Sequence, residues 1–227
     1  MKLAIAVAAA LLLPQEKNEA EELYKKMEAK ILEAKTIQAR LQGSMIQDTQ
    51  HLDMRGELLL GEKNQARYEI TTQIGSTVTP STAVTDGKKM ALVYPDGKGA
   101  PTNAAIPEKF GRLMRVRLAR AGVVAASEAM QVEKVLKEDP ATTIKVRDFK
   151  LGAKEKVAWR EAQQVEYRMT KAGEPDRAAT VWIDLETHLP LKRVLRMGPW
   201  TVTERYLSFS LDEKIEPSKF ELPWEAK

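Results

Sequence analysis

The sequence contains no cysteine and only two histidines, His51 and His188. The lack of cysteine excludes a disulfide scaffold, a thiolate nucleophile, a cysteine-ligated metal and the acylated cysteine of a bacterial lipoprotein. Two imidazoles are too few for a histidine-rich metal site. We therefore predict no cofactor and no metal.

The sequence also lacks catalytic signatures. It has no G-x-S-x-G, no H-E-x-x-H, no phosphate-binding loop and no G-x-G-x-x-G after a strand. Glu57, Asp86, Asp184 and Glu204 could be paired as acid and base, but 32 acidic residues make such pairs inevitable. Solvated strand and turn positions are the simpler interpretation. The sequence therefore predicts a protein that is not an enzyme.

Composition and charge are those of an ordinary folded protein. The 227 residues are 43% hydrophobic and 30% charged, enough for one substantial core. A net charge of +4 permits contact with anionic lipid or nucleic acid but requires neither. Nucleic acid is not expected, because no aromatic residues are interleaved with the basic ones. We predict a monomer with a single domain over residues 15–227.

The longest apolar run lies at the N-terminus, from Leu3 to Leu13, after Met1-Lys2 and before Pro14. It is too short to span a bilayer but typical of a secretory signal. The small residues that would mark a cleavage site precede three leucines rather than follow them. We predict that residues 1–14 direct export; an uncleaved anchor and a buried N-terminal helix are the alternatives.

Hydrophobic periodicity then predicts one helix followed by a strand meander. Asn18 and Glu21 form a capping box, and apolar residues recur every three or four positions as far as Ala34. A period of two follows over residues 37–45, 55–60 and 66–74. Residues 82–85 and 89–94 flank Asp86-Gly87, a strong hairpin signal. These patterns predict five antiparallel strands with one wet face.

The second half of the chain predicts one or two helices and further strands. An apolar stripe over residues 110–121 is stopped by Gly122, and a second short helix is predicted over residues 127–138. Strands are predicted at 143–151, 154–159 and 162–170, and in the stretch from Thr180 to Phe209. Phe220 is predicted to pin the chain end against the body. The class is α+β: a curved antiparallel sheet of about 11 strands covered by an N-terminal helix and one or two mid-chain helices.

Basic residues gather on the helix predicted to end at Gly122, with no acid among them. Arg112, Arg115 and Arg120 are therefore candidates for contact with anionic headgroups or an acidic partner. The simpler alternative is a solvated polar face on a helix whose apolar stripe packs on the sheet.

A sheet of this length with one apolar face must curl and be covered. Two or three helices are few for about eleven strands, so an incompletely filled apolar concavity is expected. Such a concavity suits a lipid or acyl chain. The alternative is that Trp, Met and Leu side chains fill it.

Several short motifs, in order and spacing over residues 18–224, resemble the LolA-like family of periplasmic lipoprotein carriers and lipoprotein-sorting proteins. These motifs are Gly56-Glu57-Leu58-Leu59-Leu60, Arg67-Tyr68-Glu69-Ile70, Asp86-Gly87-Lys88, Trp182-Ile183-Asp184, Leu189-Pro190-Leu191 and Lys219-Phe220-Glu221-Leu222-Pro223. At two places the chain departs from the carrier. It has Glu62-Lys63 and Ala66 where the carrier has an arginine-proline turn and an inward-facing phenylalanine.

The resemblance implies a half-open barrel in the periplasm whose apolar cavity takes lipoprotein acyl chains or other lipids, without catalysis. Positions that line the matching strands become candidates for the cavity wall: Leu58, Leu60, Tyr68, Ile70, Met90, Leu92, Trp182 and Leu191. A different class of function remains open. The protein could be an envelope sensor or scaffold that binds another membrane or envelope protein through its sheet face or basic helix, with no lipid cargo.

Overall fold

The computed structural model describes residues 18–93, 99–101, 105–131 and 133–223. The predicted targeting segment, residues 1–14, lies outside this part of the chain. Within it, no helix is both long and apolar enough to cross a membrane. The same residues contain no group of three or more His, Asp or Glu side chains that could hold a metal ion.

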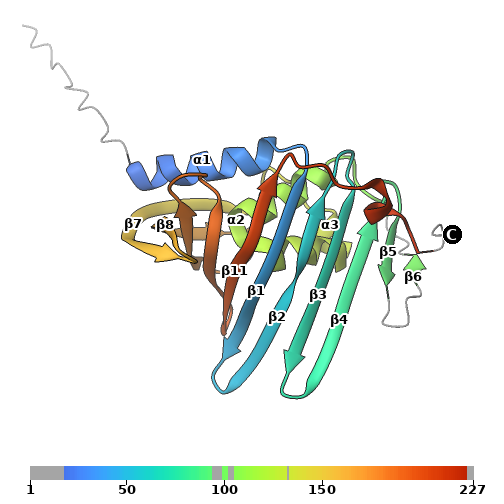
Figure 1. The fold of residues 1–227 in the computed structure, drawn as a ribbon, viewed down its shortest axis with the longest axis horizontal. Helices are drawn as coiled ribbons and strands as arrows, with labels where there is room; N and C mark the ends of the chain where they lie inside the picture. The colour runs from blue at the N-terminus through green and yellow to red at the C-terminus, as the bar shows by residue number, and fades with distance from the viewer. Residues whose placement is uncertain (1–17, 94–98, 102–104, 132, 224–227) are drawn as a thin grey trace, which may run out of the picture.

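One antiparallel sheet of eleven strands forms the body of the molecule (Figure 1). Its strands are β1 (Ile37–Gln47), β2 (Gln50–Leu60), β3 (Ala66–Ile74), β4 (Thr77–Thr85), β5 (Met90–Val93), β6 (Gly99–Pro101), β7 (Lys145–Val157), β8 (Arg160–Thr170), β9 (Arg177–Asp184), β10 (Pro190–Met197) and β11 (Trp200–Leu211). Their order is β6-β5-β4-β3-β2-β1-β11-β10-β9-β8-β7. Two meanders are thus joined where the first strand pairs with the last.

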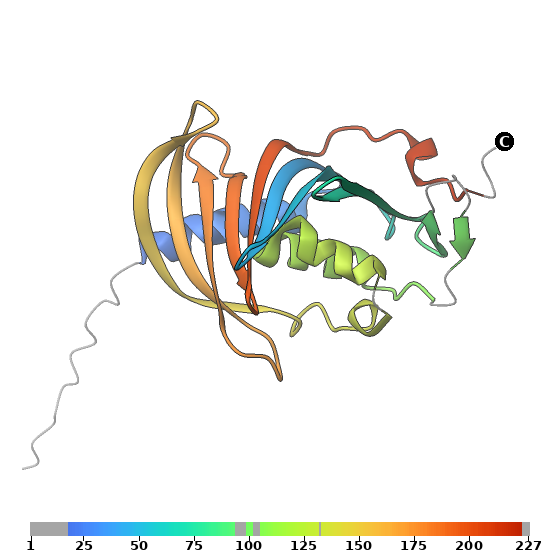
Figure 2. The same cartoon turned by 90° about the horizontal axis from the view of Figure 1, so that it is seen from below.

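The sheet curves around α2 (Phe110–Gln131), and α1 (Glu19–Glu33) packs against α2 and β7 (Figure 2). The short helices α3 (Glu133–Leu136) and η1 (Pro217–Phe220) complete the fold. The edge strands β6 and β7 stand at opposite ends of the sheet order, so the barrel is half-open. The predicted fold class is therefore confirmed.

The first helix forms for the reasons its sequence predicts. The side chain of Asn18 accepts a hydrogen bond from the backbone N–H of Glu21, at 3.2 Å, and acidic residues occupy the first turn. Its buried face consists of Ala20, Tyr24, Met27 and Ile31. The prediction of an amphipathic helix here is confirmed.

The middle of the chain differs from its prediction. Gly122 does not end the helix: it is a non-helical kink, with φ 93° and ψ −175°, and the helix resumes at once through Gln131. The helix predicted over residues 127–138 is thus replaced by the second half of α2 together with α3. Residues 145–157 form one long strand, not two, because bulges after Arg147 and Leu151 absorb the irregular positions. The short strand β6 was not predicted.

Apolar residues cluster on both sides of the sheet. The main core lies between its concave face and the two long helices. A smaller cluster of Val84, Ala91 and Leu222 lies where the C-terminal segment packs. Phe220 is buried, and Gly61 faces its ring closely enough that a Cβ there would lie 2.9 Å from it. The predicted terminal phenylalanine contact is confirmed.

Candidate ligand cavity

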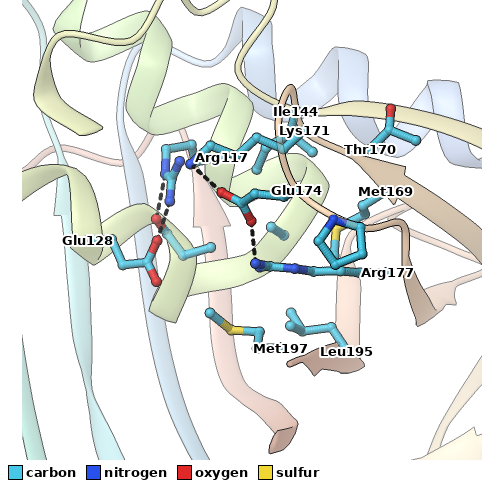
Figure 3. A pocket seen from close by; sticks show the side chains of 13 residues that line it. Arg117, Glu128, Ile144, Met169, Thr170, Lys171, Glu174, Arg177, Leu195 and Met197 are labelled. Atoms are coloured by element: carbon cyan, nitrogen blue, oxygen red, sulfur yellow. Dashed lines mark hydrogen bonds and ion pairs between the residues drawn. The ribbon is translucent and has the colours of Figure 1, made fainter. Parts of the chain in front are cut away.

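A cavity of about 150 Å³ lies between α2 and the ends of β8, β9 and β10 (Figure 3). We call the apolar lining residues the floor and the charged lining residues the rim. The floor residues are Ala121, Ala125, Ile144, Met169, Leu195 and Met197, and the rim residues are Arg117, Glu128, Lys171, Glu174 and Arg177.

The floor follows from strand alternation and from small residues on the helix. Leu195 and Met197 are two positions apart on β10, so both point toward the concave face. Met169 reaches the same space from β8. Opposite them α2 presents Ala121 and Ala125, on either side of the kink. The side chains of these two alanines are single methyl groups. Larger side chains at these positions would fill the space, so the cavity stays open.

Arg117 anchors the rim although its side chain is only 2% exposed. Its guanidinium donates to Glu128 at 2.5 Å, to Glu138 at 3.0 Å and to the carbonyl of Ala125 at 2.6 Å. Lys171 joins the network, 2.7 Å from Glu138. Arg117 therefore ties the two halves of α2 to the loop after α3.

The rim continues into the turn between β8 and β9. Lys171 lies 3.2 Å from Glu174, which also pairs with Arg177. Three cations and two anions thus line the cavity, and a third anion, Glu138, pairs with Arg117 and Lys171 beside it. The charges of these six side chains balance overall.

Protonation equilibria reflect this network. Burial by itself would raise the pKa of the Glu138 carboxyl, but hydrogen bonds from Lys171 and Thr143 and the charge of Arg117 lower it below the ordinary 4.5. Burial would likewise lower the pKa of Lys171, but its bonds to Glu138 and Glu174 raise it above the ordinary 10.5. Both groups are held in their charged forms around neutral pH.

The kink beside the cavity is stabilised from the sheet. Glu204, on β11, is fully buried, and its carboxylate accepts hydrogen bonds from the backbone N–H of Val123 at 3.0 Å and of Val124 at 2.8 Å. The hydroxyl of Tyr206 donates to it at 2.5 Å. Glu204 therefore caps the second half of α2, where unpaired N–H groups and the helix dipole favour an anion. Gly122 allows the close approach: a Cβ there would lie 2.3 Å from Oε2 of Glu204.

A second buried cation fixes the first half of α2. Arg193, the cross-strand neighbour of Glu204, donates to the carbonyl of Ala119 at 2.8 Å and to the hydroxyl of Tyr167 at 2.9 Å. Tyr24 of α1 also donates to Ala119, at 3.3 Å. Burial raises the pKa of both tyrosines, so they remain neutral donors. The helices are thus joined to the sheet by polar bonds as well as by apolar packing.

No family model and no curated protein matches the sequence. LprF from Mycobacterium bovis shares the fold with a TM-score of 0.51, at 8% identity over 91% of this chain and 98% of that chain. This likeness shows the fold alone.

Two further solved structures resemble this chain. Mycobacterium tuberculosis lipoprotein LppX has a TM-score of 0.48 at 10% identity, over 86% of this chain and 98% of that one. A LolA superfamily protein from Nitrosomonas europaea has a TM-score of 0.37 at 9% identity, over 90% and 98%. Identities this low establish a shared fold and no more.

Six of the eight predicted lining residues face the concave side of the sheet. They belong to or pack against the main core: Leu58, Leu60, Tyr68, Ile70, Met90 and Leu92. None of them lines the cavity between α2 and β8–β10. On their half of the sheet, α2 packs over β2 and β4.

Trp182 and Leu191 require a correction. They lie with Ala162 in a separate cluster outside the main core. For Trp182 the physical reason is strand alternation: Val181 and Ile183 face the core on β9, so Trp182 between them points to the other side. At Leu191 the regular alternation of β10 is broken by a register shift between Pro190 and Lys192. Lys192 covers the Trp182 ring from 4.0 Å.

The basic helix also requires a correction. Arg115 donates to the carbonyls of Ala34, Lys35, Gly61 and Gly111, and therefore holds α2 to neighbouring loops. Arg120 pairs with Glu28 of α1 at 2.6 Å. Of the three arginines proposed for headgroup or partner contact, only Arg112 is exposed. Arg115 and Arg120 therefore belong neither to a solvated face nor to a recognition face. Their guanidinium groups bind partners within the fold.

Two of the acids interpreted as solvated are buried. Glu204 caps α2, and the carboxylate of Asp184 accepts from the N–H groups of Glu186 and Thr187 in the turn after β9. Asp86 does lie in a turn, where it accepts from two backbone N–H groups. The sequence does not reveal that the Glu204 carboxylate is buried. Glu204 lies in a strand where polar and apolar residues alternate, and an exposed acid would occupy the same kind of position.

Proposed function

We propose that this protein is an exported, non-catalytic lipid-binding protein that holds the end of an acyl chain in the cavity between α2 and β8–β10. The observation that carries the proposal is the contrast between an apolar floor of Met, Leu, Ile and Ala side chains and a rim of ion pairs. An acyl chain would pack against the apolar floor residues, and a polar headgroup would pair with the charged rim residues.

The size of the cavity limits what enters it. About 150 Å³ lies below the 300 to 1,000 Å³ common for ligand pockets, so only the end of an acyl chain fits in this conformation. A longer segment requires the second half of α2 to shift away from β10. The kink at Gly122 separates that half from the first, which Arg115 and Arg193 hold in place.

The polar end of the ligand would lie at the rim. Lys171 and Arg177 both pair with Glu174, and the three side chains are each about 30% exposed. A lipid phosphate or carboxylate can therefore replace Glu174 as their partner without removing charge from water. Glu62 is exposed and Ala66 is small and buried, so the proposal is lipid binding in the bacterial envelope and not lipoprotein transfer in particular.

A blocked cavity tests the proposal. In Ala125→Leu, three added carbon atoms enter the cavity. In the matched control, Ala178→Leu, the same atoms extend from an exposed position on β9. Each protein is purified from cell envelopes, checked by thermal unfolding and examined by native mass spectrometry for retained lipid. We expect lipid on the natural chain and on Ala178→Leu, and at least about fivefold less on Ala125→Leu, since roughly 1 kcal/mol or more of contact is lost. Equal retention by a folded Ala125→Leu, or no lipid on the natural chain, refutes the proposal.

A further inference from the structure

The tip of the β7–β8 hairpin carries a tryptophan that the fold does not use. Val157 pairs with Arg160, so Ala158 and Trp159 form a two-residue turn. The Trp159 side chain is 94% exposed. The hairpin projects beyond its neighbouring strands at one end of the molecule (Figure 2).

The backbone of this turn is unfavourable for the residues that occupy it. Ala158 has φ 48° and Trp159 has φ 68°, both in the left-handed region. Two-residue hairpin turns of this kind favour Asn-Gly, and a bulky residue there is an outlier. The indole is almost entirely in solvent, so burial of the ring does not offset this strain. Exposure and strain at one residue indicate that it serves binding.

The strand that leads to the tip carries most of the net positive charge of the chain. β7 contains five basic and two acidic residues, a difference of three, whereas the whole chain has a net charge of +4. All five basic side chains are exposed: Lys145, Arg147, Lys150, Lys154 and Lys156. β7 is also an edge strand of the sheet.

We propose that the β7–β8 tip docks on an anionic lipid bilayer, with the Trp159 indole in the interface and Lys154 and Lys156 near lipid phosphates. Indole rings favour the headgroup level of a bilayer, and lysines beside them add attraction to anionic lipid. Lys156 lies 3.5 Å from Glu161, but both side chains are more than half exposed, so this ion pair is weak.

This surface is distinct from the ligand cavity. The tip precedes the first residue of β8, Arg160, whereas Met169 and Lys171 of the cavity lie at the other end of the strand. Docking therefore does not depend on the proposed cargo. It accounts for a tryptophan that neither the core nor the cavity requires.

Trp159→Gly separates docking from folding. Glycine adopts φ 68° without strain, so this variant is expected to unfold at the same or a higher urea concentration than the natural chain. The assay is co-sedimentation of the full chain with vesicles of phosphatidylglycerol and phosphatidylethanolamine. Loss of the indole is expected to weaken binding about tenfold or more. Lys154→Gln/Lys156→Gln is expected to weaken it about 10- to 30-fold at low salt, and less at high salt.

Matched variants remove similar groups elsewhere. Ile74→Ser removes an exposed apolar side chain from the β3–β4 hairpin, and Lys88→Gln/Lys89→Gln removes two charges from the β4–β5 turn. Both are expected to bind vesicles like the natural chain. The proposal is overturned if Trp159→Gly binds as well as the natural chain, if phosphatidylcholine vesicles bind equally well, or if the natural chain binds no vesicles.

Discussion

Replacing Glu204 by alanine should destabilise the protein by about 3–5 kcal/mol. The substitution leaves the N–H groups of Val123 and Val124 without their cap, which costs about 0.5–2 kcal/mol. The Tyr206 hydroxyl loses its acceptor, at about 1–3 kcal/mol. The buried charge of Arg193, the cross-strand neighbour of Glu204, loses its nearby anion. Removing one partner of a buried charged pair typically costs about 3–5 kcal/mol, and we take this range as the total for the substitution.

Urea unfolding followed by circular dichroism measures this loss. Domains of this kind are stable by about 5–15 kcal/mol, so the variant should unfold at a much lower urea concentration. Glu166→Ala, at an exposed position on β8, is the matched control and should change stability by no more than about 0.5 kcal/mol. Glu204→Gln, which keeps the shape and one acceptor oxygen, should fall between them. A loss below about 1 kcal/mol for Glu204→Ala would refute the capping role.

Two further predictions concern the kink and the rim. Gly122→Ala should cost at least about 2 kcal/mol more than Gly173→Ala in urea unfolding, because both have positive φ but only the first places a Cβ 2.3 Å from Glu204; equal costs would contradict the close approach. Because the folded-state pKa of Glu138 is lowered, its stabilisation is present above 4.5 and is lost as the pH falls through the lower value. Because the pKa of Lys171 is raised, its contribution is present below 10.5 and is lost as the pH rises through the higher value. The stability difference between the natural chain and Glu138→Gln should therefore be largest near neutral pH and shrink on acidification; a difference that does not change with pH would show that the rim charges do not matter.

Local patterns were sufficient to predict most of the sheet and the first helix. Asn18 and Glu21 define a helix start without reference to the rest of the chain. The alternation from Ala66 to Ile74 specifies a strand with one buried face, and Asp86-Gly87 specifies the turn that follows the next strand. In each case the signal lies within about ten residues, so no knowledge of the partners was needed.

The kink and the cavity depend on contacts between distant residues, and the sequence does not show them. Gly122 has the signal of a helix end, but Glu204, far away in sequence, satisfies the next N–H groups and the helix resumes. The lining candidates were taken from the strands that carried the resemblance. The open space instead lies where two alanines of α2 oppose β8–β10, and that depends on where the helix packs.

Methionine methyl groups can locate a bound acyl chain directly. Met169 and Met197 line the cavity, whereas Met90 lies on β5, which is six positions from β10 in the sheet order. We would record NMR spectra of the methyl-labelled protein with a fatty acid that carries a nitroxide near its end. Our account predicts that the Met169 and Met197 signals broaden while the Met90 signal persists. Broadening of Met90 with Met169 and Met197 unchanged would place the ligand under the other half of the sheet and contradict the account.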